Sequence, residues 1–127
     1  MKILSLVLRI LLGLLLLMPV AGAVGLFPPP TEEMYTPAGW AFISALMNTG
    51  YMMPLITLDC LACAVLVFIG RTALAAVLLA PFTVNVIAFH WFLDTVPVSA
   101  SSSLAYVLLV LNLFFLWENR SKYRSLW

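Results

Sequence analysis

The sequence predicts an all-α protein, an integral membrane four-helix bundle with a short interfacial or re-entrant helix between its first two spans. The first observation behind this fold class is that 65% of the residues are hydrophobic and only 9% are charged. A soluble domain carries roughly 25% charged residues, and so few charges cannot cover the surface of a small globule. The second observation is that four apolar stretches approach the length of about 20 residues that a membrane-crossing helix needs. We therefore expect residues 1–127 to form a single transmembrane domain.

The predicted spans are long apolar runs separated by more polar links. They cover residues 3–27, 52–69, 72–93 and 103–118. Arg9 lies near enough to the start of the first span for its long side chain to carry the charge to the membrane surface. The short link between the last two spans predicts that these two helices are antiparallel neighbours.

The segment between the first two spans predicts one more, shorter helix. Thr36 suits the N-cap of a helix, Pro37 its first position and Gly50 its C-terminal stop. A helix over residues 37–48 would be about 18 Å long, which is too short to cross a membrane. We expect it to lie on the outer side of the membrane, in the interface or re-entering it. Its aromatic anchors would be Trp40 and Phe42.

The charged residues favour one orientation of the four spans. When the spans alternate in direction, all the basic residues fall on one side: Lys2, Arg9, Arg71, Arg120, Lys122 and Arg124. Glu32, Glu33 and Asp94 fall on the other side. The positive-inside rule then places both termini in the cytoplasm. Because no basic patch lies outside these flanking positions, the sequence argues against a nucleic-acid partner.

The first apolar run has a second interpretation, as a cleaved signal peptide. Residues 1–23 begin with a basic region and end in an Ala-x-Ala pattern at Ala21 and Ala23. Cleavage there would leave three spans with the same charge asymmetry, so the charges do not separate the two interpretations. The apolar run continues to Phe27, beyond the length of an ordinary signal peptide, and we favour the retained helix.

Polar side chains inside the predicted spans are candidate ligand-binding residues, because a polar group in the bilayer is costly. The candidates are Asp59, Asn85, His90 and Asn112. At 1.5 Å per residue, Asp59, Asn85 and Asn112 lie at nearly the same depth on three helices, and His90 lies nearer the outer surface. The same residues could instead be hydrogen-bonded links between helices, which average about 0.6 kcal/mol each.

The third span combines a polar stripe with a proline. Thr83, His90 and Asp94 share one face of the helix. Asn85 points about 140° away from His90 if the helix is regular. Pro81 cannot donate a backbone hydrogen bond, and a kink there could turn Asn85 and His90 toward one cavity.

Cys60 and Cys63 form a C-x-x-C pair in the second span. Thiol chemistry needs an accessible thiolate, which apolar surroundings disfavour. Membrane quinone reductases that generate disulfides also use a second cysteine pair, whereas this chain has two cysteines in all. We therefore expect the two cysteines to be small core residues. With a single histidine and no cluster of suitable spacing, the sequence predicts no metal site.

Residues 50–94, "GYMMPLITLDCLACAVLVFIGRTALAAVLLAPFTVNVIAFHWFLD", resemble the DoxX-like small membrane proteins of bacteria. The shared features are the Gly-Tyr-x-x-Pro start, an acidic residue early in the second span, the Gly-Arg turn and the stretch "APFTVNVIAFHWFLD". An arginine in the first span and the four-span layout fit as well. The chain differs from that group at Asp59, where Glu is more common, and at Cys63, where a small glycine is common.

The resemblance implies a bacterial inner-membrane protein without catalytic activity of its own, acting as an accessory component of a quinone- or redox-linked membrane complex. Some relatives are subunits of a thiosulfate:quinone oxidoreductase. A quinone is the ligand that it implies, and the implied partners are the lipid bilayer, subunits of a redox complex and further copies of the chain. The residues leave two alternatives open. One is a small proton-coupled transporter with Asp59 as the coupling acid, and the other is a membrane scaffold that binds no ligand.

Overall fold

A computed structural model describes residues 2–28, 31–50, 52–93 and 100–126, which contain helices and no strand. The all-α prediction is therefore confirmed for these residues. In chain order the elements are α1 (Lys2–Ala23), the 3-10 turn η1 (Glu32–Met34), α2 (Pro37–Thr49), α3 (Met52–Phe68), α4 (Thr72–Ala88), the π-helical turn η2 (Phe89–Leu93), α5 (Ala100–Glu118) and the 3-10 segment η3 (Arg120–Leu126).

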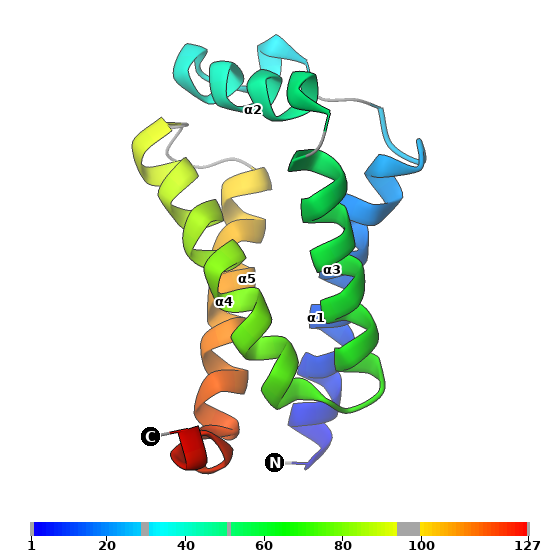
Figure 1. Ribbon diagram of the computed structural model, residues 1–127, viewed down its shortest axis with the longest axis vertical. Helices are drawn as coiled ribbons and strands as arrows, with labels where there is room; N and C mark the ends of the chain where they lie inside the picture. The colour runs from blue at the N-terminus through cyan, green and yellow to red at the C-terminus, as the bar shows by residue number, and fades with distance from the viewer. Residues whose placement is uncertain (1, 29–30, 51, 94–99, 127) are drawn as a thin grey trace.

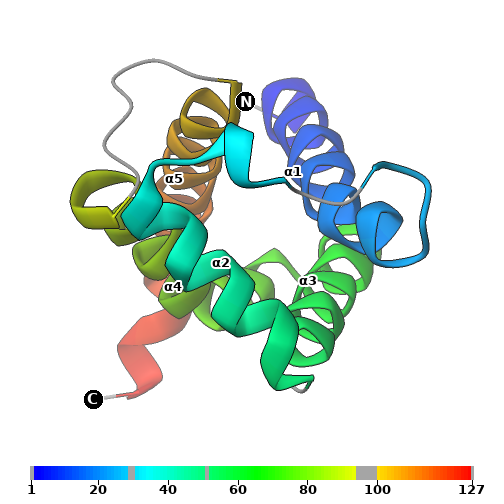
Figure 2. The same cartoon turned by 90° about the horizontal axis from the view of Figure 1, so that it is seen from above.

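The four longest helices run side by side, and α2 lies across one end of them (Figures 1 and 2). Helix α1 packs along α3, α4 packs along α5, and α3 also contacts α4. The expectation that the last two long helices are neighbours is therefore confirmed. The start of α1 and the segment η3 both lie at the end of the bundle opposite α2 (Figure 1).

Two helical segments of the described chain are long and apolar enough to cross a membrane. They are α1, Lys2–Ala23, and the continuous segment of α4 and η2, Thr72–Leu93, each of 22 residues. Helices α3 and α5 contain shorter apolar stretches, Pro54–Phe68 and Ser103–Glu118.

Helix α1 ends at Ala23, short of the predicted residue 27. Gly25 has a φ of 87°, a left-handed conformation that favours glycine. The N–H of Leu26 donates to the carbonyl of Ala21 at 3.0 Å, and that of Gly25 donates to Gly22 at 3.2 Å. This pair of hydrogen bonds is a Schellman motif, which satisfies carbonyls left over at the helix end. Because the sequence stays apolar through residue 27, hydrophobicity alone predicted a longer helix.

The start of α2 has the predicted cap. The Thr36 side chain accepts a hydrogen bond from the backbone N–H of Gly39 at 3.2 Å, with Pro37 at the first helical position and Gly50 at the C-cap. The same hydroxyl donates to the carbonyl of Leu93, at the end of η2, at 2.7 Å. One side chain thus both caps α2 and ties it to the end of the α4–η2 segment.

The close-packed core occupies the half of the bundle nearer the start of α1. Its buried members come from α1, α3, α4 and α5: Leu12, Leu16, Cys60, Cys63, Ala64, Val67, Ala75, Ala76, Leu79, Leu108, Leu111 and Phe115. Phe115 is the largest of the fully buried side chains. Gly13 gives α1 a close approach to α3, because a Cβ at this position would stand 2.4 Å from the ring of Phe68.

Side-chain hydrogen bonds join the C-terminal segment to the start of α4. The hydroxyl of Tyr123 donates to the carbonyl of Ala73 at 2.8 Å, and the side-chain amide of Asn119 donates to the hydroxyl of Thr72 at 3.2 Å. Burial raises the pKa of the Tyr123 phenol above its ordinary value of 10.0, so the hydroxyl keeps the proton that it donates. These contacts hold η3 against the bundle end that carries the basic residues.

Candidate functional site beneath α2

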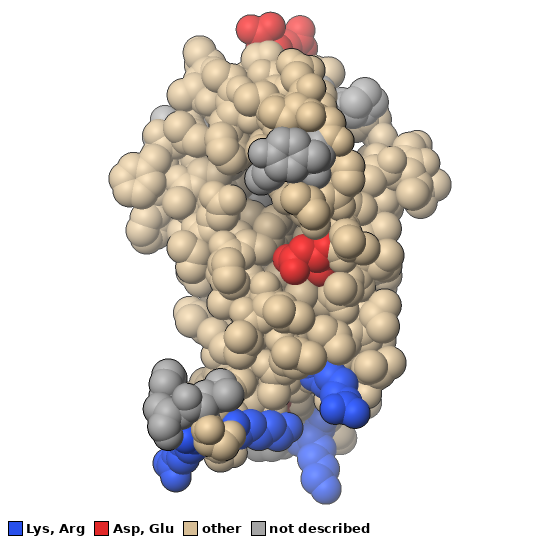
Figure 3. All heavy atoms as spheres, in the orientation of Figure 1, with Lys and Arg blue, Asp and Glu red and all other residues tan. Residues whose placement is uncertain are grey.

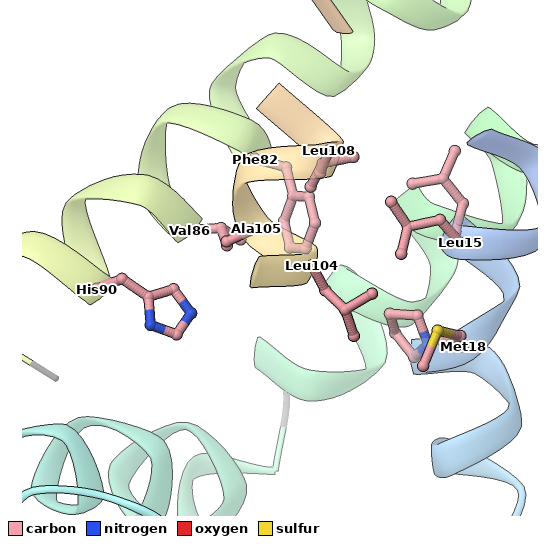
Figure 4. Close-up of a pocket in the computed structure, with 10 residues that line it drawn as sticks. Leu15, Met18, Phe82, Val86, His90, Leu104, Ala105 and Leu108 are labelled. Atoms are coloured by element: carbon pink, nitrogen blue, oxygen red, sulfur yellow. The ribbon is translucent and has the colours of Figure 1, made fainter. Parts of the chain in front are cut away.

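A cavity with two lobes lies between the core and α2. One lobe, of about 250 Å³, lies among α1, the α4–η2 segment and α5, and we call it the α5 lobe (Figure 4). The other, of about 230 Å³, lies among α2, α3 and the α4–η2 segment, and we call it the α2 lobe. Phe82, Val86 and His90 line both lobes, so we treat them as one site.

The walls of this cavity are almost entirely apolar. His90 is the polar side chain among the residues that line the α5 lobe, where Figure 4 shows its imidazole extending away from its helix toward the space between the helices. Tyr35, Asn85 and His90 are the polar side chains that line the α2 lobe. An apolar cavity with a few convergent polar groups is the usual form of a site for a small organic ligand.

His90 is held in place by the π-helical turn η2 and by aromatic neighbours. Its ring meets the ring of Phe89 edge to face, with centroids 5.1 Å apart. Phe89 in turn contacts Phe42 of α2 at 5.5 Å and Tyr35 at 6.2 Å. Edge-to-face pairs of this kind stabilise a fixed arrangement of rings. The aromatic cluster therefore links the position of His90 to that of α2.

The π-helical turn was not predicted from the sequence. At its start the N–H of Phe89 donates to the carbonyls of both Asn85 and Val86, a shared hydrogen bond that is common where an α-helix ends. Such turns are rare and are frequent at functional sites. In a regular α-helix Asn85 and His90 would point in different directions, whereas here both line the α2 lobe. Pro81 lies inside α4, which continues to Ala88.

The structure separates the four candidate site residues into two groups. Asn85 and His90 line the cavity. Asn112 is buried in the core, where its amide donates to the carbonyl of Ala76 at 3.0 Å and links α5 to α4. Asp59 is partly exposed on α3 and does not line either lobe.

The predicted polar stripe is interrupted below His90. The hydroxyl of Thr83 is buried and donates to the carbonyl of Leu79 in its own helix at 3.1 Å. It therefore offers no donor to the cavity. Asp94, one turn beyond His90 in the prediction, lies outside the described residues.

Sequence reasoning missed the contribution of α2 to the site. Phe42, Ile43 and Leu46 line the α2 lobe, and Tyr35 precedes the helix there. Phe42, expected as a lipid anchor, packs on Phe89 instead. The spacing of the three α2 residues marks one apolar helix face, which is the signal that would have indicated a buried side.

We expect Cys60 and Cys63 to resist thiol reagents in the folded protein. Both are fully buried and free, neither lines the cavity, and the Cys63 thiol points to the carbonyl of Ala75 at 3.9 Å. Because alkylation needs an accessible thiolate, a maleimide should label them only after denaturation, as read by mass spectrometry. A Thr49→Cys variant, with its thiol at the exposed end of α2, is the positive control. Rapid labelling of the native pair would contradict the role of core residues and reopen a redox role.

The described residues hold no cluster of three or more His, Cys, Asp and Glu side chains that could bind a metal ion. No protein-family model, curated protein or solved structure matches this chain. The site beneath α2 is therefore interpreted from its own residues: an apolar cavity, closed on one side by a tethered helix, with an imidazole and a carboxamide on its wall.

Proposed function

We propose that this chain is a four-span protein of the bacterial inner membrane whose cavity binds the head group of a lipid-soluble, quinone-like molecule. In keeping with the resemblance to DoxX-like proteins, it would serve as an accessory component of a redox-linked membrane complex. The observation that carries the proposal is the placement of His90 and Asn85 together on the wall of one apolar cavity.

The surface of the bundle supports a membrane location. Large apolar side chains are exposed along α1, α3, α4 and α5, which is unfavourable in water and favourable in lipid. The Lys and Arg residues gather at the end of the molecule opposite α2 (Figure 3). By the positive-inside rule that end faces the cytoplasm, so α2 and the cavity lie toward the outer surface. Helices α3 and α5 have shorter apolar stretches than α1 and α4. Because they pack against these two helices, they would cross the membrane beside them.

The chemistry of the cavity supports a ligand with an apolar ring and one or two hydrogen-bonding oxygens. An imidazole N–H and the NH₂ group of Asn85 can donate to carbonyl oxygens, such as those of a quinone. The remaining walls are aliphatic and aromatic, and they would contact the ring faces. In such surroundings a polar ligand atom without a partner would be costly, so these two side chains would select the ligand.

Trp40 provides a reporter for binding. Its ring stacks on Tyr35, with centroids 6.2 Å apart, and Tyr35 lines the α2 lobe. We expect a short-chain ubiquinone to quench tryptophan fluorescence of the protein in nanodiscs, and a Trp40→Phe variant to lose most of that change. We expect Asn85→Leu and His90→Phe each to weaken binding about tenfold, because each removes one hydrogen bond in an apolar site.

Asn48→Leu is the matched control for the Asn85 variant, since Asn48 is exposed near the end of α2 and outside the cavity. Equal binding by all variants would contradict the site. A separate test addresses membrane insertion: the protein should stay in the membrane pellet after extraction with alkaline carbonate. If the protein is inserted in the membrane but binds no quinone, the two alternative functions remain, a proton-coupled transporter and a scaffold that binds no ligand. Proton-coupled uptake of a substrate that disappears in Asp59→Asn would favour the transporter.

A further inference from the structure

Another hollow lies at the opposite end of the molecule, away from the cavity beneath α2. It has a volume of about 380 Å³ and lies between the start of α1 and the end of α5. Its lining residues are Lys2, Ser5, Leu6, Arg9 and Glu118. We call it the terminal groove. Figure 3 shows that the basic side chains of the molecule gather at this end.

The charges of the terminal groove are arranged as a dipole. Lys2, Ser5 and Arg9 recur at helical spacing on one face of α1, and Glu118 is the last residue of α5. The first turn of a helix carries partial positive charge and the last turn partial negative charge. The α1 wall therefore attracts an anion, and the α5 wall attracts a cation.

The cations of the groove are not in direct contact with its carboxylate. Within the described part of the chain, no ion pair or hydrogen bond joins Glu118 to Lys2 or Arg9. Glu118 and Arg9 are both partly buried, which makes an external partner for each charge more favourable than it would be on an open surface. A ligand that carried both charges would satisfy both walls at once.

The groove also lies at the level of a membrane surface. A Cβ on Gly70, in the turn between α3 and α4, would stand 3.7 Å from Nη1 of Arg9. The Arg9 side chain therefore extends from the third turn of α1 to the level of the turn between α3 and α4, as expected for an arginine that reaches the interface. Along its first turns α1 also exposes Ile3, Leu6, Val7 and Ile10, against which acyl chains could lie.

We propose that the terminal groove binds the head group of an aminophospholipid, with the phosphate at Lys2 and Arg9 and the primary ammonium group at Glu118. The hydroxyl of Ser5 is placed to donate to a phosphate oxygen. An ammonium group donates hydrogen bonds to a carboxylate, whereas the trimethylammonium group of phosphatidylcholine cannot. Phosphatidylglycerol has the phosphate and no cation for Glu118. This proposal rests on the membrane location proposed above and is independent of the ligand beneath α2.

The test is native mass spectrometry of the full-length protein in detergent, titrated with phosphatidylethanolamine, phosphatidylcholine and phosphatidylglycerol of identical acyl chains. We expect phosphatidylethanolamine to bind about fivefold more tightly than either of the others. Glu118→Gln should remove that preference, and Arg9→Gln should weaken all three lipids about fivefold. Lys2→Gln, at an exposed position, provides a second phosphate-side variant whose folding is not at risk.

Arg124→Gln is the control, because Arg124 is an exposed cation at the same end of the molecule and does not line the groove. Tighter binding of phosphatidylglycerol than of phosphatidylethanolamine would overturn the proposal, since it would indicate a plain anion site. Equal binding of phosphatidylethanolamine and phosphatidylcholine would overturn it too, as would a preference that survives in Glu118→Gln. Extraction with alkaline carbonate tests the membrane location separately. A protein that is not in the membrane can therefore be distinguished from a membrane protein whose terminal groove binds no aminophospholipid.

Discussion

Val86→Trp is expected to weaken ligand binding at least about hundredfold while the bundle stays folded. Val86 lines both lobes of the cavity beneath α2, so an indole at this position would occupy the space between them. Overfilling a packed core usually costs about 1–3 kcal/mol, but here unoccupied volume lies beside the side chain. The ligand and the indole would compete for the same space, and the ligand would be excluded.

The measurement is equilibrium binding of a radiolabelled short-chain ubiquinone to the protein in nanodiscs, because a new tryptophan would disturb a fluorescence signal. Val84→Trp is the matched control: the same substitution on the same helix, at a side chain that is 66% exposed and does not line the cavity. Unchanged affinity in Val86→Trp would mean that the quinone binds elsewhere or that the cavity holds no ligand.

Phe115→Ala is expected to lower the free energy of unfolding by about 3 kcal/mol. Phe115 is fully buried among the core residues of four helices, and its removal would leave a void the size of a phenyl ring. In the lipid surroundings that we propose, the hydrophobic effect would not drive helices together, so the cost would come from lost dispersion contacts and the cavity itself. We therefore place it at the lower end of the range known for buried phenylalanine.

Unfolding by SDS, titrated into mixed micelles and followed by circular dichroism, would measure this loss. Phe92→Ala is the control, because Phe92 is 77% exposed on η2 and its truncation should change the free energy of unfolding by less than about 0.5 kcal/mol. Similar losses in both variants would mean that the packing of the core does not distinguish these positions.

The two substitutions probe two halves of one bundle that differ in packing. The half near the chain ends is close-packed and linked by side-chain hydrogen bonds to carbonyls of α4, including those from Asn112 and Tyr123. The half beneath α2 holds the cavity, and α2 is joined to the end of η2 by the hydrogen bond from Thr36 to Leu93. We expect substitutions in the first half to change stability and substitutions in the second to change binding.

Much of the fold followed from local features of the sequence. The apolar runs predicted the long helices, and Thr36, Pro37 and Gly50 predicted the bounds of α2, because capping depends on a few neighbouring residues. The segregation of basic residues to one end also followed from the order of charges along the chain. Gly25 shows the limit of such reasoning, because an apolar run hid a glycine that ends α1 in the structure.

The candidate site could be predicted only in part. Asn85 and His90 stood out as polar residues in an apolar run, but so did Asp59 and Asn112. Depth along a helix follows from the rise per residue, whereas direction around the helix depends on every turn between two positions. The π-helical turn that contains His90 has no signal in the sequence that we recognise.

By itself, then, the sequence determined the helical class, the approximate helix bounds and the charge asymmetry, since each depends on residues close together in the chain. Only the tertiary structure decided which polar residues meet at one place. In the structure Asn112 links α5 to α4 and Asp59 lies outside the cavity. Helix α2 packs over the lobe that His90 and Asn85 line. A cavity is the space that packed helices leave between them, so it depends on contacts between distant segments that no local pattern records.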